Sequence, residues 1–215
     1  MAKAALKPKP PELVIHDCEQ GTPEWFEARR GKVTASELSK IMADSDDKLG
    51  RTKLLRQLAG EVITEEPRKE YTNAYMEAGK EREAEARDWY ARKKITSVDR
   101  AGFIYNPAIV AGWSPDGLVG KDGAVEIKIA EPHIIIGLLE KGTFPNEHRA
   151  QCVGGALLIG RRRWVDLVVY SHPKLPVYIA RLEPDPAYMT EVSDAIEVFN
   201  WDLKKLVERT RARMR

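Results

Sequence analysis

The chain has 215 residues, which is enough for one substantial hydrophobic core. Hydrophobic residues make up 43% of the sequence and charged residues 32%, a composition typical of folded globular proteins that excludes a largely disordered chain. The 35 Lys and Arg residues nearly cancel the 33 Asp and Glu residues, so net charge does not indicate a nucleic-acid partner. Such a partner has to be argued from local basic clusters, of which Arg161–Arg163 is one.

Cysteine content and hydropathy exclude further classes of protein. Cys18 and Cys152 are the two cysteines, and two isolated thiols cannot form a zinc site or an iron–sulfur cluster by themselves. No apolar run approaches the roughly 18 residues that a membrane-spanning helix needs, and the first residues lack the apolar stretch of a secretory signal. We therefore expect a cytoplasmic protein with no membrane partner.

The N-terminal segment is expected to be a flexible tail over residues 1–12, because it is rich in Lys and Pro and has no apolar period. Residues 13–215 are expected to form a single domain. Its first helix begins after Thr22, which can cap it, with Pro23 in the first helical position. Gly31 is the predicted end of this helix.

Three more helices are predicted in the first half of the chain. Thr34 and Glu37 have the spacing of a capping box, in which each side chain satisfies a free backbone donor, and this box opens a helix that continues to about residue 42. Apolar spacing predicts a helix over 51–64 and a longer one over 72–94. The N-terminal part of the domain is therefore expected to be helical.

The central part of the sequence has the residue pattern of a β-sheet. Short runs rich in β-branched and aromatic residues are separated by turn signals, and they predict strands over 103–105, 109–113, 118–119 and 124–129 that form an antiparallel meander. Further helices are predicted over 132–141, 146–158 and 186–211, and strands over 164–171 and 177–182. The fold class is therefore α/β, with a central mixed sheet flanked by helices, and helix 146–158 can cross over between two strands.

Charged residues stand inside one of these predicted strands. Alternation places the apolar residues of strand 124–129 on one face and Glu126 and Lys128 on the other, where burying a carboxylate and an ammonium is costly. The turn at 121–123 would fold the preceding strand back and bring Asp116 beside Glu126, although the sequence leaves the register open.

Two adjacent carboxylates are a hard-oxygen site that suits Mg²⁺. A bound Mg²⁺ makes water more acidic and neutralises charge that develops on a phosphodiester, while a nearby lysine can orient the attacking water. The arrangement of Asp116, Glu126 and Lys128 therefore indicates phosphodiester hydrolysis. An ion-pair cluster on a half-exposed strand fits the same three residues equally well.

A family resemblance distinguishes these interpretations. Pro115-Asp116 followed by Glu126-Ile-Lys128 resembles the PD-(D/E)xK nuclease signature. With Trp25, Arg29-Arg-Gly31, Thr34-Ala-Ser36, Gly79-Lys-Glu-Arg-Glu83 and Ala150-Gln151, the chain resembles the lambda exonuclease family, also called the YqaJ-type viral recombinase family. The match extends from about residue 21 to the strand near residue 182. Grouped as Trp/Arg/Thr-Ala-Ser, Gly-Lys…Glu, Ser-Pro-Asp-Gly, Glu-x-Lys and Ala-Gln, the five motifs stand in the family's order, and five weak motifs in order are specific.

The resemblance implies a restriction-endonuclease-like fold and a set of site residues. By it, Asp116 and Glu126 bind metal together with the backbone carbonyl of Ile127, and Lys128 is the catalytic lysine. It adds two catalytic residues for which the sequence alone offers little, and these are Glu83 and Gln151. Without the family, each of these two would be a solvated residue on a helix surface.

The resemblance also implies a pocket for the terminal 5′-phosphate of DNA, formed by Arg29, Ser36 and Ser114. Arg presents forked donors to phosphate oxygens, and Ser36 lies in the first turn of a predicted helix, whose N-terminus favours an anion. Without the family resemblance, the sequence favours Arg29 as a salt-bridge residue and Ser36 as part of the helix cap.

As the family implies, we expect a Mg²⁺-dependent 5′→3′ exonuclease that acts on double-stranded DNA ends, releases mononucleotides and leaves 3′ overhangs. The resemblance further implies two Mg²⁺ ions per site with Mn²⁺ as a substitute, a ring-shaped homotrimer, and a single-strand annealing protein as partner in phage-type recombination within a bacterial host. Two alternatives are a DNA endonuclease of the same superfamily and a DNA-binding or docking module that has lost catalysis.

Overall fold

The computed structural model describes residues 10–42, 48–68 and 74–214 of the chain. Residues 1–9 of the expected tail lie outside these ranges, and so do residues 72 and 73 at the start of an expected helix. Among the described residues, no helix is both long enough and apolar enough to cross a membrane.

The strands form two four-stranded sheets. The first sheet has the strand order β1-β3-β4-β2, with β1 (Val14–His16), β2 (Val33–Thr34), β3 (Phe103–Asn106) and β4 (Ala111–Trp113). The second sheet has the order β5-β6-β7-β8, with β5 (Gly117–Val119), β6 (Gly123–Ile129), β7 (Trp164–Tyr170) and β8 (Tyr178–Leu182).

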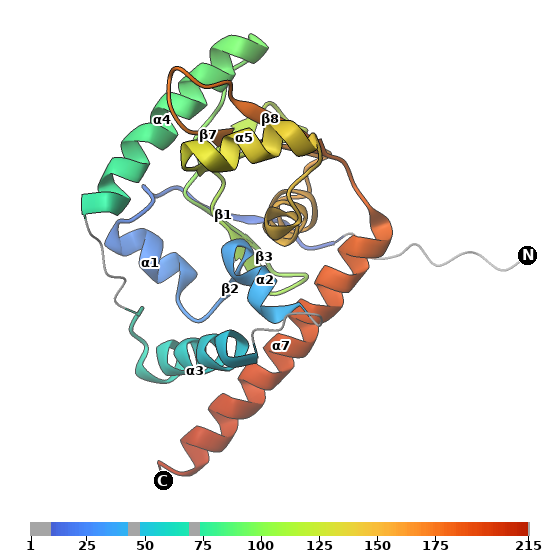
Figure 1. The fold of residues 1–215 in the computed structure, drawn as a ribbon. Coiled ribbons are helices and arrows are strands. Elements are labelled where there is room, and N and C mark those ends of the chain that lie inside the picture. Colours follow the sequence, from blue (N-terminus) through green and yellow to red (C-terminus); the bar gives the residue numbers. More distant parts are fainter. Residues whose placement is uncertain (1–9, 43–47, 69–73, 215) are drawn as a thin grey trace, which may run out of the picture.

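Helices surround both sheets and confirm the mixed α/β fold class. The α-helices are α1 (Pro23–Arg29), α2 (Leu38–Ile41), α3 (Lys48–Thr64), α4 (Ala74–Lys94), α5 (Pro132–Lys141), α6 (Arg149–Cys152) and α7 (Pro186–Ala212). Two 3₁₀ turns, η1 (Ala35–Glu37) and η2 (Asn146–His148), and a π-helical segment, η3 (Val153–Ile159), complete the helical structure. Figure 1 shows α4 and α7 on opposite sides of the molecule, with the sheets between them.

The expected single sheet is divided in two at the segment between β4 and β5. β3 pairs with β4 and β5 pairs with β6, both antiparallel as the meander predicts, but β4 does not pair with β5. Pro115 lies in this connection and has no N–H to donate to a neighbouring strand. The chain therefore leaves the first sheet at this point and begins the second.

The second sheet has a parallel centre and antiparallel edges. β6 and β7 are parallel, so the chain must cross over between them, and it does so through α5, η2, α6 and η3. This confirms the predicted crossover by the helix 146–158, which the structure divides into three short helical types. Strands β1 and β2 were not predicted, because three and two residues are too few to show a period.

Each face of the second sheet packs against different helices. Val125 and Ile127 of β6 lie with Ala86 and Tyr90 of α4 in one cluster of buried side chains. Ala124, on the opposite face, belongs to the main core, to which α3, α7 and η3 also contribute. The alternation predicted for this strand is therefore confirmed, and Glu126 and Lys128 share the face of Ala124.

Two glycines allow η3 to approach the first sheet and α2 closely. A Cβ atom on Gly155 would lie 2.7 Å from a ring carbon of Trp113, and one on Gly154 would lie 2.0 Å from a Leu38 methyl carbon. Both positions therefore have to remain free of a side chain. This contact fixes the helical run that begins at η2 against the core.

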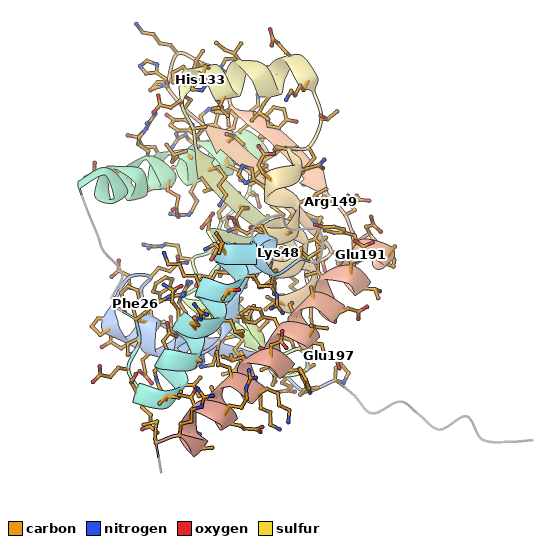
Figure 2. All side chains as sticks on the ribbon, turned by 60° about the horizontal axis from the view of Figure 1, so that its bottom comes forward. Phe26, Lys48, His133, Arg149, Glu191 and Glu197 are labelled. Carbon is orange, nitrogen blue, oxygen red and sulfur yellow. The ribbon has the colours of Figure 1, made fainter. Side chains whose placement is uncertain are left out.

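The longest helix, α7, forms the outer wall of the main core together with α3. Arg51 of α3 donates a 2.6 Å hydrogen bond to Asp202 of α7, which joins the two helices at their surface. Figure 2 shows Lys48 at the start of α3, and Glu191 and Glu197 on α7. These two helices contribute packing and lie on the side of the molecule away from α4.

The turn η1 differs from the expected capping box. The hydroxyl of Thr34 donates to the carboxylate of Glu37 at 2.9 Å, so the two side chains bond to each other instead of to backbone donors. Glu37 is buried and also accepts a 2.7 Å hydrogen bond from Arg68. Because Arg68 supplies a charged partner, the carboxylate turns toward it and leaves the helix terminus.

Candidate active site

The β5–β6 hairpin brings the two expected metal-binding carboxylates together. Gly117 pairs with Val125, and extending this antiparallel register by one residue places Asp116 opposite Glu126. One carboxylate oxygen of Asp116 accepts a 2.7 Å hydrogen bond from the main-chain N–H of Ile127. The register that the sequence left open is therefore the one that joins these acids.

Glu126, Lys128 and Gln151 form a closed set of hydrogen bonds. Lys128 Nζ donates to Glu126 Oε1 at 2.8 Å and to Gln151 Oε1 at 3.0 Å. The amide nitrogen of Gln151 donates to the same Glu126 oxygen. Gln151 belongs to α6, so the crossover helix completes a hydrogen-bonded set whose other two members lie on β6.

Exposure differs between the two charged members of this set. The Glu126 side chain is 3% exposed, whereas the Lys128 side chain is 28% exposed. The Lys128 side chain is therefore partly accessible to an external ligand, whereas the Glu126 side chain is enclosed.

Like charges dominate the electrostatics of the site. Burial raises the pKa of Asp116 well above its usual value, and the nearby charges of Glu126 and Glu83 raise it further. Burial lowers the pKa of Lys128, but Glu126 and Asp116 more than offset this, so its pKa is raised. The site thus holds more negative charge than its own lysine neutralises, and it favours an additional cation.

Glu83 reaches the site from α4, with Arg87 one turn further along the same helix. Arg87 donates to the Glu83 carboxylate at 2.5 Å and to the main-chain carbonyl of Asp116 at 2.6 Å. Burial raises the pKa of Glu83, Arg87 opposes this shift, and Glu126 adds to it. Glu83 is therefore electrostatically part of the site, as the family resemblance implies.

The donor set fits a divalent cation with oxygen ligands. Within the described ranges no group of three or more His, Cys, Asp or Glu side chains is arranged to hold a metal ion. Asp116 and Glu126 supply two carboxylates, and Mg²⁺ is commonly held by one or two carboxylates with water in its other positions. Extending the β5–β6 register places Pro115 opposite Ile127, and Pro115 cannot donate to the Ile127 carbonyl. That carbonyl is a suitable further ligand.

Two of the three residues expected to bind a terminal phosphate are in contact. Arg29 donates to the hydroxyl of Ser114 at 3.4 Å, and the indole N–H of Trp25 donates to the same hydroxyl at 2.8 Å. The Arg29 guanidinium lies over the Trp25 ring, 4.0 Å from its centroid. The stacking and the hydroxyl together fix the direction of the Arg29 side chain.

Ser36 lies in the turn η1, directly after the strand β2. β2 and β4 are parallel neighbours, with Thr34 beside Gly112, so Ser36 and Ser114 each lie two residues beyond a paired position. Ser36 is exposed, and its hydroxyl is 3.3 Å from that of Thr34. The structure thus places Arg29 against Ser114, and Ser36 in the turn that follows the edge strand β2.

The phosphate-pocket residues and the carboxylates lie close together along the chain. Ser114 precedes Asp116 by two residues, a span of at most about 7 Å in an extended chain. DNA rises about 3.4 Å per nucleotide along each strand. The distance from Ser114 to Asp116 is therefore large enough for a terminal phosphate to lie near Ser114 while the next phosphodiester lies near Asp116.

Sequence reasoning missed three polar residues around the site. Arg87 and Gln20 both bond to the main chain near Asp116, and Gln20 does so through its amide nitrogen, 2.9 Å from the Pro115 carbonyl. His148 lies three residues before Gln151, and burial together with the charge of Lys128 lowers its pKa. The four-residue spacing of Glu83 and Arg87 was a usable signal, whereas nothing in the sequence links Gln20 to Pro115.

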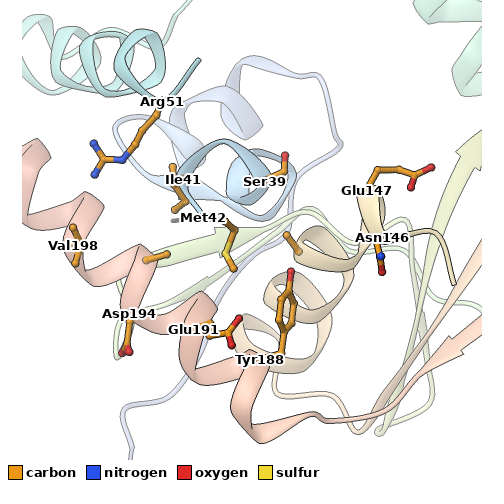
Figure 3. Close-up of a pocket in the computed structure, with 12 residues that line it drawn as sticks. Ser39, Ile41, Met42, Arg51, Asn146, Glu147, Tyr188, Glu191, Asp194 and Val198 are labelled. Atoms are coloured by element: carbon orange, nitrogen blue, oxygen red, sulfur yellow. The ribbon is translucent and has the colours of Figure 1, made fainter. Parts of the chain in front are cut away.

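A large groove lies on another part of the surface. It has a volume of about 890 Å³ and lies between α2, α7 and the η2–α6 segment, where Figure 3 shows Met42, Tyr188 and Glu191 facing it. Its described lining residues include none of the site residues predicted from the sequence. The groove is therefore separate from the carboxylate site, although Ala150 of its lining precedes Gln151.

Comparisons with known proteins agree with the family resemblance. The family model of the YqaJ-like viral recombinase domain matches residues 24–159. None of the curated proteins is significantly similar to the chain. The matched range includes Asp116, Glu126, Lys128 and Gln151, so it covers the whole carboxylate site.

Several solved structures share the fold. An alkaline exonuclease (LHK-Exo) from Laribacter hongkongensis is 31% identical, with 90% of this chain and 98% of that chain covered and a TM-score of 0.80. The same exonuclease in complex with dAMP is 32% identical, covering 90% and 100% of the two chains with a TM-score of 0.79. A phage-related exonuclease from Haemophilus somnus 129PT, 12% identical over 83% and 96% of the chains, shares the fold with a TM-score of 0.63.

Proposed function

The chain belongs to the YqaJ-like viral recombinase family, and on this premise we propose that it is a Mg²⁺-dependent exonuclease of double-stranded DNA. It degrades one strand in the 5′→3′ direction, releases mononucleotides and leaves 3′ single-stranded overhangs for annealing. The observation that carries this proposal is the juxtaposition of Asp116, Glu126, Lys128 and Gln151 at one end of the β5–β6 hairpin. A related exonuclease of known structure binds dAMP, a DNA mononucleotide, which supports a nucleotide product.

The roles of the side chains follow from their contacts. Asp116, Glu126 and the Ile127 carbonyl would hold Mg²⁺, which neutralises charge on the phosphodiester and makes water more acidic. Lys128 is exposed enough to orient the attacking water or to contact a phosphate oxygen. Gln151 fixes the Lys128 ammonium through its carbonyl oxygen, so the lysine has one preferred direction.

Polarity of degradation depends on recognition of the DNA end. We assign the terminal 5′-phosphate to Arg29, Ser36 and Ser114, because an arginine fork and hydroxyl donors match phosphate oxygens. With the phosphate held there, the first phosphodiester lies toward Asp116, and hydrolysis releases one nucleotide. An internal site on DNA has no terminal phosphate and does not fill this pocket.

The metal content is part of the proposal. We assign two Mg²⁺ ions to each site, with Glu83 as an additional acidic residue, and we expect Mn²⁺ to substitute because it accepts the same oxygen ligands. Two ions can stabilise both the attacking and the leaving oxygen of an in-line displacement. A calorimetric titration of metal-free protein with Mg²⁺ measures this stoichiometry directly.

The partners follow from the family resemblance. We propose a ring-shaped homotrimer through which duplex DNA passes, and a single-strand annealing protein that receives the 3′ overhang within the cytoplasm of a phage-infected bacterium. A closed ring suits an enzyme that must stay on its substrate for many cycles. Light scattering of the purified protein, alone and with a blunt duplex, tests the trimer.

The test of function uses linear duplexes that carry a label at either the 5′ or the 3′ end of one strand, with a covalently closed circle as control. We expect early release of the 5′ label as a mononucleotide with Mg²⁺, and no change in the circle. Cleavage of the circle would support an endonuclease of the same superfamily instead. No cleavage with Mg²⁺ or Mn²⁺ would indicate a DNA-binding or docking module.

A further inference from the structure

The turn that carries Asp116 is held from outside the sheet by two side chains. The amide nitrogen of Gln20, in the loop after β1, donates to the carbonyl oxygens of Pro115 at 2.9 Å and Ala101 at 3.2 Å. Arg87 of α4 donates from Nε to the carbonyl oxygen of Asp116 at 2.6 Å. Two successive carbonyls of the turn are thus fixed by side chains from different parts of the chain.

This arrangement compensates for the end of the regular strand pairing. β5 begins at Gly117, so the main chain of Pro115 and Asp116 lies beyond the strand and relies on side chains for its hydrogen bonds. Without them, the turn would be free to move while β5 stayed paired with β6. The Asp116 carboxylate would move with the turn.

Arg87 links the same turn to a second acidic residue. Its terminal nitrogen donates to the Glu83 carboxylate at 2.5 Å while Nε holds the Asp116 carbonyl. The guanidinium is planar and rigid, so the two acceptors are held in a fixed relation to each other. The Arg87 side chain is 13% exposed, which restricts its movement and leaves little surface for a direct contact with DNA.

We infer that Gln20 and Arg87 are positioning residues, which fix the distance between the Asp116 and Glu83 carboxylates and so set the geometry of the metal site. This inference deepens the proposed function and rests on it. Site geometry matters at this scale because a displacement of about 1 Å can reduce a catalysed rate by about 100-fold. Neither residue is assigned to substrate or metal contact.

The two residues differ in what they hold, which leads to different expected effects. Arg87 contacts both the turn and Glu83, whereas Gln20 contacts the turn and the neighbouring Ala101 carbonyl. Loss of Arg87 should therefore disturb two carboxylates, and loss of Gln20 should disturb one. Because neither is assigned a contact with DNA, metal affinity and kcat should fall while KM for DNA ends is unchanged.

The test compares Arg87→Gln, Arg87→Lys and Gln20→Leu in the full chain. Arg92→Gln is the matched control for Arg87, because Arg92 is exposed on the same helix, and Gln57→Leu is the control for Gln20, because Gln57 is exposed on α3. Three quantities are measured for each protein: Mn²⁺ affinity by calorimetry without DNA, kcat and KM on labelled duplex ends, and the midpoint of thermal unfolding.

We expect Arg87→Gln to weaken Mn²⁺ binding and to lower kcat by about 10- to 100-fold, which is the range for residues that orient metal ligands. For Gln20→Leu we expect losses near the lower end of this range. Arg87→Lys should recover part of the loss, because it keeps the charge beside Glu83 but cannot hold both acceptors. The controls should stay within about twofold of the wild type, as for other exposed substitutions.

Two results would overturn the inference. One is Mn²⁺ affinity and kcat in Arg87→Gln and Gln20→Leu equal to those of the controls. The other is a loss that disappears when activity is expressed per folded molecule, since that indicates a purely structural role. If the wild type hydrolyses no DNA, the proposed function fails separately, and the Mn²⁺ affinities of folded variants still show whether the two residues shape the metal site.

Discussion

Two buried carboxylates on neighbouring strands of the second sheet have different partners for their negative charge. Asp166 on β7 accepts two hydrogen bonds from the Arg181 guanidinium, at 2.6 and 2.9 Å, and one from the Tyr90 hydroxyl at 2.7 Å. Glu126 on β6 accepts from Lys128 and Gln151 and has the carboxylates of Asp116 and Glu83 as electrostatic neighbours.

The comparison distinguishes a structural ion pair from a candidate active site. At Asp166 one acid meets one guanidinium, and the hydroxyl of Tyr90 ties α4 to the sheet. At Glu126 three acids are gathered around Lys128, and Arg87 is directed to Glu83 and to a main-chain carbonyl. Asp166 and Glu126, taken as whole residues, are each 2% exposed or less, so burial alone does not separate them. The balance of charge around each acid separates the structural ion pair from the candidate active site.

The largest expected effect is on hydrolysis. Lys128→Ala should reduce the rate at DNA ends by about 1000-fold, within the range for removal of a group that directs proton transfer or stabilises charge. Folding should be retained at low temperature, but Lys128→Ala also removes the charged partner of the buried Glu126, so stability should fall. Single-turnover release of a 5′ label measures the rate, with circular dichroism as the check on folding. A variant with the wild-type rate would remove Lys128 from the catalytic site.

The second effect should appear in stability and leave catalysis intact. Arg181→Met leaves the buried Asp166 without its charged partner and should lower the free energy of unfolding by about 3 kcal/mol. For a chain of this size that corresponds to a fall of roughly 6–12 °C in Tm. Calorimetry measures the shift, and activity at low temperature should be within about twofold of the wild type. Loss of activity in the folded variant would show that the two clusters are not separate in function.

The third effect concerns the DNA end. Arg29→Ala removes charge-assisted hydrogen bonds to a terminal phosphate and should slow hydrolysis of 5′-phosphorylated ends by about 10- to 100-fold. Ends with a 5′-hydroxyl should be affected much less. Arg30→Ala is the control, because Arg30 pairs with the exposed Glu27 on the same segment. Equal losses on both kinds of end would exclude Arg29 from the phosphate pocket.

The smallest effect is a pH dependence of the metal-free protein. Burial and the neighbouring acids raise the pKa of Asp116 in the folded state, so its protonated form stabilises the fold below its usual pKa. This contribution is lost as the pH rises through the raised pKa, where the charged form predominates. Asp116→Asn should therefore flatten the fall in stability with rising pH. Chemical denaturation at a series of pH values without metal measures it, and identical slopes for both proteins would contradict it.

The sequence predicted how the charged residues are arranged on the β5–β6 hairpin but not the side chains that support it. The alternation of residues 124–129 placed Glu126 and Lys128 on one face, and the turn at 121–123 brought Asp116 to the same end, both local consequences of strand geometry. The pairing of Gln20 with Pro115 links residues 95 positions apart, and no pattern within either segment indicates it. Such contacts depend on how whole elements pack, which periodicity does not describe.

The division of the strands into two sheets was the other feature that could not be predicted from the sequence. Helices such as α3, α5 and α7 were predicted nearly to their observed ends, because apolar spacing and capping residues are local signals. The number of sheets was not, since it depends on whether β4 pairs with β5 across Pro115. The proline could have indicated the break, because it removes a donor from any ladder that continues through it.

The most direct test of the account is a calorimetric titration of metal-free protein with Mg²⁺. Asp116→Asn and Asp166→Asn make the same carboxylate-to-amide change at the two contrasted clusters of the second sheet. The account predicts that the wild type and Asp166→Asn bind Mg²⁺ alike, while Asp116→Asn binds at least about tenfold more weakly. Equal binding by all three proteins would contradict the assignment of the Asp116 and Glu126 cluster as the metal site.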